Sequence, residues 1–200
     1  MKGLVWLGGL IIVALIIGSG IAGSYNSLVR LDQAAQAQWA QVENAYQRRA
    51  DLVPNLVATV RGAANFEQST YTAVAEARAK VGQLSFPAGQ GPAQDPAAFA
   101  KFAQTQDQLG GALSRLLATV ENYPALKATQ NFRDLQAQLE GTENRIAVER
   151  MRFNTAAQAF NTTRDTLPTA MFVGFFGGRF NEKAYFKSTP GAEQAPSVHF

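Results

Sequence analysis

Few residues of this chain have the chemistry that catalysis needs. His199 is the only histidine, and the sequence contains no cysteine. A serine, histidine and aspartate relay, a zinc motif built on a histidine pair and a di-iron site built on Glu-x-x-His therefore lack their parts. A cysteine nucleophile and a thiolate zinc site are excluded as well. We predict no catalytic residue, no metal site and no cofactor, and we expect a protein that is not an enzyme.

Two other patterns resemble functional motifs only in part. Glu140 and Glu143 lie one helical turn apart, as paired carboxylates would, but Arg145 nearby favours a solvated, salt-bridged helix face. The run GFFGGRF at 174–180 lacks the spacing and the preceding strand of a phosphate-binding loop. The net charge of +3 is small and scattered, which argues against nucleic acid as a partner.

The N-terminal segment has the composition of a membrane anchor. Residues 4–22 (LVWLGGLIIVALIIGSGIA) carry no charge, and about 19 residues at about 1.5 Å each cross the hydrocarbon core of a bilayer once. We predict a transmembrane anchor over 1–24. A cleaved signal peptide is the alternative, with Gly20 to Ala22 as its cleavage site. Lys2 slightly favours a cytoplasmic N-terminus over Arg30, which would place the following domain on the extracytoplasmic side.

The rest of the chain is patterned as long helices. Apolar residues recur every three or four positions over 25–82, 96–122 and 124–166, and the second of these stretches follows a heptad pattern. Short connections between helices favour antiparallel neighbours. We therefore predict an all-α fold, with an elongated antiparallel three-helix bundle over 25–167.

Two segments break this periodicity. Glycine and proline over 82–96 predict a surface loop, and Asp95 offers a cap for the helix that follows. The tail over 168–200 is rich in glycine and phenylalanine. Its aromatic side chains either cap the open end of the bundle or enter a membrane interface, and the absence of a helical moment favours capping.

Pro54 stands in the middle of the first predicted helix. It could end the helix, start a new one near Asp51, or kink a continuous one. The apolar stripe resumes in phase after it, and Ala50, four residues earlier, has a small side chain. We therefore predict a kinked helix that continues to about Val81, with the proline as the elbow between a membrane-proximal stalk and the bundle.

Polar residues inside or beside the stripes suggest contacts between helices. Asn154 and Asn161 each follow a phenylalanine and lie a heptad apart, where an amide could bond to a neighbouring helix or to water. Glu149 and Arg150 either extend to the edge of the core or form an ion pair with the face that carries Arg48 and Arg49. Gly110 and Gly111 favour a close helix approach over simple tolerance.

Five segments, in this order, resemble the LemA family of bacterial membrane-associated proteins. They are the apolar N-terminus, YNSLV at 25, RRADLVPNLV at 48, ENYPALKATQNFRDLQAQLEGTENRIAVERMRFN at 121 and YFKSTPGAEQAPSVHF at 185. The resemblance implies a single-pass membrane protein of the bacterial envelope with an elongated antiparallel helical domain and no recognised catalytic residues. It also points to membrane proteases as candidate partners.

The leading functional expectation is a non-enzymatic, membrane-anchored scaffold or adaptor of the bacterial cell envelope. It would contact the lipid bilayer through the anchor, and a protein partner or further copies of itself through its helix faces. A membrane-surface remodelling or lipid-sensing protein is the alternative, and an accessory factor of a membrane protease is a further one. Structural or interaction roles are expected of Arg49, Asp51, Pro54, Asn55, Glu121, Tyr123, Pro124, Glu143, Asn154 and Asn161.

Overall fold

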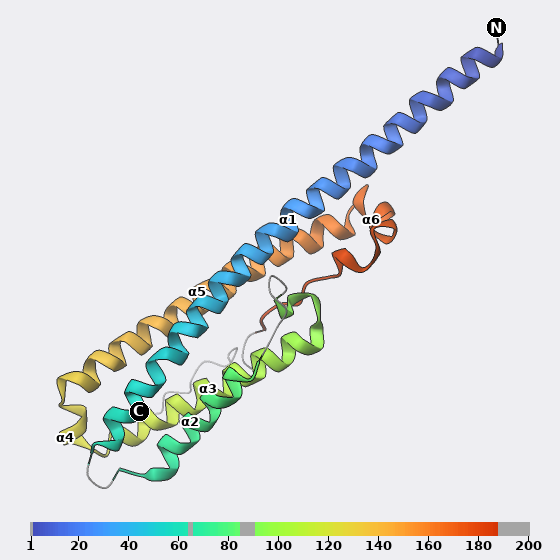
Figure 1. Cartoon of the computed structure of the whole chain (residues 1–200). Helices are drawn as coiled ribbons and strands as arrows, with labels where there is room; N and C mark the ends of the chain where they lie inside the picture. Colours follow the sequence, from blue (N-terminus) through green and yellow to red (C-terminus); the bar gives the residue numbers. More distant parts are fainter. Residues whose placement is uncertain (1, 64–65, 85–90, 188–200) are drawn as a thin grey trace, which may run out of the picture.

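The computed structural model describes residues 2–63, 66–84 and 91–187. Its elements are α1 (Lys2–Arg61), α2 (Gln68–Gly82), η1 (Pro92–Gln94), α3 (Pro96–Val120), α4 (Pro124–Lys127), α5 (Gln130–Asp165), α6 (Thr169–Phe172) and η2 (Val173–Phe180). No strand occurs among the described residues, and the predicted all-α class is confirmed. α1 extends beyond the other helices toward the N-terminus, and α5 runs back along it (Figure 1).

α1 is a single helix that passes through Pro54. It contains 60 residues, about 90 Å at about 1.5 Å per residue. Proline has no N–H, so the carbonyl of Ala50 loses its usual helical donor. Arg78 of α2 replaces that donor, because its Nε donates to the Ala50 carbonyl oxygen at 3.0 Å. The prediction of a helix that continues through the proline is confirmed, and the backbone group left open is satisfied from a neighbouring helix.

Pro54 does not separate a stalk from the bundle, and the predicted elbow is wrong. One face of α1 is buried from Ser24 onward, and Leu28 already packs against Phe160 and Phe180. The bundle therefore packs along one face of the whole second half of α1, on both sides of the proline in the sequence.

The prediction of one helix over 25–82 is also wrong, since α1 ends at Arg61 and α2 begins at Gln68. Gly62 follows the last helical residue, and glycine at this position is a common helix stop. The apolar stripe resumes in phase after the turn because Val60 and Val74 belong to the same core cluster. Periodicity therefore concealed the turn, and the bundle is built from four long helices, α1, α2, α3 and α5, instead of three.

The boundaries of α3 and α5 follow local capping. Oδ1 of Asp95 accepts the N–H groups of Ala97 and Ala98 at 2.9 and 3.2 Å, which confirms the predicted start of α3. The helix predicted over 124–166 is interrupted after α4, because the Thr129 side chain caps α5 by accepting the N–H of Phe132. Of the predicted loop over 82–96, residues 85–90 lie outside the described part of the chain.

Three apolar clusters lie along the bundle. The cluster farthest from the N-terminal end includes Val60, Leu116 and Phe132, and the one nearest to it consists of Leu28, Phe160 and Phe180. The middle cluster is centred on Trp39, whose ring centroid lies 5.1–5.9 Å from those of Phe99, Phe102, Phe153 and Phe186. Phe180, from the tail, packs into the cluster at one end of the bundle, as the predicted capping requires, whereas Phe186 packs into the middle cluster instead of an end.

A double-mutant cycle tests the compensation at Pro54. Arg78→Ala removes the donor to the Ala50 carbonyl and should lower the free energy of unfolding by about 1 kcal/mol. In a Pro54→Ala background the restored backbone N–H serves the same carbonyl, so Arg78→Ala should then cost less than about 0.5 kcal/mol. Urea titration of the detergent-solubilised chain measures both values. Equal costs in the two backgrounds would contradict the compensation.

Candidate functional site: a groove between α3 and α5

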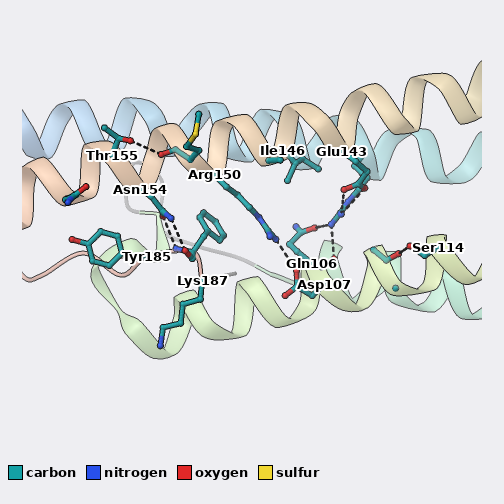
Figure 2. Close-up of a pocket in the computed structure, with 17 residues that line it drawn as sticks. Gln106, Asp107, Ser114, Glu143, Ile146, Arg150, Asn154, Thr155, Tyr185 and Lys187 are labelled. Atoms are coloured by element: carbon teal, nitrogen blue, oxygen red, sulfur yellow. Dashed lines mark hydrogen bonds and ion pairs between the residues drawn. The ribbon is translucent and has the colours of Figure 1, made fainter. Parts of the chain in front are cut away.

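An open groove of about 1150 Å³ lies between α3 and α5. Two arginine side chains bridge it, and Figure 2 shows one of them, Arg150, reaching from α5 toward Asp107 on α3. Its lining comes from α1 (Arg49), α3 (Gln106, Asp107, Gly110, Gly111, Ser114), α5 (Glu143, Ile146, Ala147, Arg150, Met151, Asn154, Thr155, Gln158) and the tail (Tyr185, Phe186, Lys187).

The first bridge is made by Arg49, which enters the groove from α1. Its Nη1 donates to the Glu143 carboxylate of α5 at 3.1 Å. Its Nη2 donates to the backbone carbonyl oxygen of Gln106 at 2.9 Å and to the Gln106 Oε1 at 2.6 Å. The Arg49 side chain is only 4% exposed, whereas that of Glu143 is 42% exposed. A buried charge is costly unless it is paired and hydrogen-bonded, so Arg49 ties three helices together at this point.

The second bridge consists of Tyr46, Arg150 and Asp107, one from each of the same three helices. The Nε of Arg150 donates to the Tyr46 hydroxyl at 2.5 Å, and its Nη2 donates to Asp107 Oδ1 at 3.1 Å. Burial raises the pKa of the Tyr46 phenol, against the opposing effect of the Arg150 charge. Burial lowers the pKa of Arg150, but Tyr46 and Asp107 outweigh it and the net pKa is raised. Both groups therefore keep their protons at neutral pH.

The predicted pairing of Glu149 and Arg150 with Arg48 and Arg49 is wrong. Glu149 is 3% exposed, and its carboxylate accepts from Gln38 Nε2 of α1 at 2.7 Å and from Arg152 Nη1 at 3.1 Å. The alternative prediction, that Glu149 extends to the edge of the core, is also wrong because its carboxylate is buried. Of the four charged residues, Arg49 and Arg150 are the two that bridge the groove.

The glycine pair of α3 faces open space instead of another helix. A Cβ added at Gly111 would meet no atom within 4 Å, and one at Gly110 would meet only the Arg49 guanidinium, at 3.5 Å. The interpretation of a close helix approach is therefore wrong. The two glycines give the α3 wall of the groove a surface without side chains.

Asn154 and Asn161 hold the tail against α5. Each side-chain amide makes two hydrogen bonds with the backbone of one tail residue. Asn154 donates to the Phe186 carbonyl oxygen at 2.8 Å and accepts the Phe186 N–H at 2.9 Å. Asn161 pairs in the same way with Lys183, both distances being 2.9 Å. Both amides therefore bond to the extended tail segment. The two predicted partners, a neighbouring helix and water, are both wrong.

A buried ion pair fixes the same segment to α1. Lys183 is 2% exposed, and its Nζ lies 2.6 Å from Asp32 Oδ1 and 4.5 Å from the ring centroid of Phe160. Asp32 is itself 4% exposed. The tail is consequently held at one residue by both long helices, and it forms the end wall of the groove.

The remaining predicted residues of α1 lie outside the groove. Asp51 is exposed and accepts from Gln47 Nε2 at 2.8 Å, and it caps nothing because no helix restarts there. The carbonyl oxygen of Asn55 accepts from the Thr59 hydroxyl at 2.8 Å within α1. Neither side chain joins the bridges.

Three other predicted residues lie at the end of the bundle that is far from the anchor. Glu121 forms an exposed ion pair with Lys127. Tyr123 and Pro124 line a separate pocket of about 650 Å³, where the Tyr123 ring centroid lies 4.8 Å from that of Phe66. The structure therefore brings Arg49, Glu143 and Asn154 together and leaves the others apart.

Sequence reasoning missed Asp32, Tyr46 and Lys183. A signal was present for Asp32, because it stands four residues after Leu28 and three before Ala35, on the buried face of α1. Tyr46 was counted only as an apolar stripe residue. Among the described residues, no three His, Cys, Asp or Glu side chains gather closely enough to hold a metal ion.

These features define a class of protein. One helix of the described chain, α1, is long and apolar enough to cross a membrane by length and composition, and a four-helix body continues from it. The chain belongs to the LemA family, whose family model matches residues 38–200. The predicted family membership is confirmed, and family and apolar helix together indicate a membrane-associated protein.

The chain is similar to three magnetosome proteins. Magnetosome proteins MamQ 1 and MamQ 2 of Paramagnetospirillum magneticum are each 27% identical to this chain over 183 residues. Magnetosome protein MamQ of Magnetospirillum gryphiswaldense is 28% identical over 186 residues. The alignments cover 84% of this chain and 66% of each relative, so the chain spans slightly less than two thirds of the length of these proteins.

The first bridge should be asymmetric in its energetics. Arg49→Met leaves the buried side-chain oxygen Oε1 of Gln106 without its donor and should lower the free energy of unfolding by about 2–4 kcal/mol. Glu143→Gln should cost less than about 1 kcal/mol, because the half-exposed carboxylate is already solvated. Urea titration of the full chain in detergent compares the two. A larger loss for Glu143→Gln than for Arg49→Met would refute this assignment.

The second bridge predicts a loss of stability in alkali. The pKa of Tyr46 in the folded protein lies above its usual value of about 10. The protonated phenol therefore contributes its full share to the free energy of unfolding below about pH 10, and this share is lost as the pH rises through the folded pKa. The free energy of unfolding should fall more steeply above about pH 10 in the parent protein than in Tyr46→Phe. Denaturant titrations between neutral pH and that range supply the comparison, and identical slopes would rule out the raised pKa.

Proposed function

We propose that this protein is a non-enzymatic, membrane-anchored scaffold of the bacterial cell envelope. In this proposal the groove between α3 and α5 holds a segment of a partner protein or of a second copy of the chain. The observation that carries the proposal is the groove itself, about 1150 Å³ in volume and spanned by two arginine bridges that keep its walls in a fixed relation.

The lining of the groove suits a polypeptide segment with apolar and basic side chains. Arg49 and Arg150 are mostly buried, at 4% and 25% side-chain exposure, because they serve the bridges. The carboxylates of Glu143 and Asp107 are 42% and 64% exposed and can still accept hydrogen bonds. Met151 is 62% exposed beside them, and a flexible thioether packs well against varied apolar groups. The bare surface at Gly111 allows a backbone to approach closely.

The anchor would set the distance between the groove and the bilayer. Tyr25 follows the apolar segment and Arg49 marks the groove, both on the same unbroken helix. Their separation of 24 residues corresponds to about 36 Å at about 1.5 Å per residue. A partner in the groove would therefore be held well outside the headgroup region.

The other expectations stay predictions. Single-pass topology with an extracytoplasmic domain rests on the N-terminal charge and on the apolar segment. Association with a membrane protease rests on the family resemblance. Lipid sensing or membrane remodelling would need a lipid contact outside α1.

Site-specific photocrosslinking in cells tests the scaffold proposal. A benzophenone amino acid at Gly111 on one wall and at Met151 on the other should yield the same protein adduct. Val148 lies on α5 near Met151, is 40% exposed and does not line the groove, so it is the matched control and should yield no such adduct.

The mass of the adduct distinguishes the two occupants. An adduct of twice the chain mass assigns the groove to a second copy, and any other defined mass assigns it to a partner. Equal adducts from Val148 and the groove positions, or none from Gly111 and Met151, would overturn the proposal.

A further inference from the structure

The end of the bundle from which the apolar half of α1 extends is formed by α6 and η2, which fold against α1, and we call this region the base. Cε2 of Phe172 lies 3.9 Å from the place that a Cβ on Gly20 would take, and Ser24 is 5% exposed. Gly20 belongs to the last part of the uncharged segment 4–22. In Figure 1, α6 lies beside α1 at the level where α1 leaves the other helices. α6 is therefore held next to the end of the membrane-crossing segment.

Aromatic contacts fasten this base to α1. The rings of Phe176 and Phe180 meet the Tyr25 ring edge-on, with centroids 5.3 and 5.6 Å away. Nη1 of Arg179 donates to the Tyr25 hydroxyl at 2.7 Å, and its guanidinium lies 5.4 Å from the Phe180 ring centroid. Such pairs restrict the position of η2 relative to the helix axis. The base moves with α1 as one unit.

Three large apolar side chains of the base are exposed. Leu167, Met171 and Phe175 are 75%, 65% and 84% exposed, and together they form what we call the apolar collar. Single exposed apolar residues are ordinary, but a group of large ones at one place marks an interaction site. Arg179 is exposed in the same segment and adds a positive charge. An apolar face bordered by a cation is the composition of a membrane-interface segment.

We propose that the apolar collar inserts into the bilayer that α1 crosses, at the boundary between acyl chains and headgroups. The argument for lipid over other occupants is continuity. Phe172, the neighbour of Met171 in the chain, lies beside Gly20, and the side chains of the segment before it, such as Ile16 and Ile17, are apolar and 64% and 49% exposed, as in a segment that lipid surrounds. A surface that adjoins this segment at its end meets the same medium.

This second contact has a mechanical consequence. A bundle attached to a bilayer by one helix is free to rotate about that helix and to tilt with it. The collar lies off the axis of α1, so its insertion removes the rotation and gives the groove a defined direction relative to the membrane surface. The inference requires α1 to cross the bilayer but does not depend on the scaffold proposal.

The absence of native cysteine makes the test direct. Single cysteines at Phe175 and Met171 carry nitroxide labels in the full chain reconstituted into phosphatidylcholine and phosphatidylglycerol vesicles. Ile12→Cys in the apolar segment and Ala125→Cys at the far end of the bundle are the controls for lipid and for water. Electron paramagnetic resonance measures the accessibility of each label to oxygen, which is concentrated in lipid, and to a water-soluble nickel chelate.

The ratio of oxygen to chelate accessibility should rank the labels by depth. We expect the ratios at positions 175 and 171 to be high and close to the ratio at position 12, and the ratio at position 125 to be well below them. A ratio at Phe175 equal to that at Ala125 would overturn the proposal. Dipolar broadening between labels at Phe175, with both reagents excluded, would overturn it in favour of a second copy. Thermal melts of the labelled chains establish that they are folded.

Discussion

The unbroken backbone of α1 is the constraint on which the rest of the structure depends. In its first third the helix is apolar and exposed on all sides, with Leu10 69% and Leu15 67% exposed, which is the composition of a helix that can cross a membrane. In its second half only one stripe is buried, and Leu28, Val42 and Val53 are nearly inaccessible. Since both halves belong to one helix, the position of the bundle is fixed relative to the apolar half. A helix break between them would remove that relation.

Buried polar side chains lie where separate segments of the chain meet. Arg49 joins α1, α3 and α5, Glu149 joins α5 to α1, and Lys183 joins the tail to α1. Burying such groups is costly, and an apolar replacement of a whole pair is often neutral or stabilising. Their value is therefore geometric. A helix shifted by one turn would leave these donors and acceptors unpaired. A repeating apolar stripe of leucine and phenylalanine would not impose such a penalty on the shifted arrangement.

The parts of the fold that local chemistry dictates could be predicted from the sequence. The heptad stripe of α3 is buried from Phe99 to Val120, and Asp95 caps that helix. The turn after Arg61 could not be predicted from periodicity, because two helices that face one core keep the same phase. Glycine at 62 was the available signal, and it was outweighed by the apolar pattern.

The candidate site was predictable only in part, for a related reason. Arg49 and Asn154 are predicted as polar residues beside the stripes and Glu143 as part of a solvated helix face, but their partners depend on how helices distant in sequence pair. Arg49 and Gln106 are 57 residues apart, and Arg150 and Tyr46 are 104 apart. No spacing rule within one helix relates such positions. Asn154 and Asn161 illustrate the limit, since their heptad spacing predicted a shared face but not the extended tail that they bind.

The C-terminal segment links the two surfaces that the structure leaves open. η2 is fastened to Tyr25 at the base, and the residues that follow it are held by Asn161, Asp32 and Asn154 until Phe186 reaches the groove. Tyr185, Phe186 and Lys187 then form one wall of that groove. The residues that contact α1 at the base and those that line the groove therefore belong to one short segment, which hydrogen bonds and an ion pair fix to α1 and α5. This segment supplies the end wall of the groove, and its first contacts with α1 lie at the end of the bundle from which the apolar half of α1 extends.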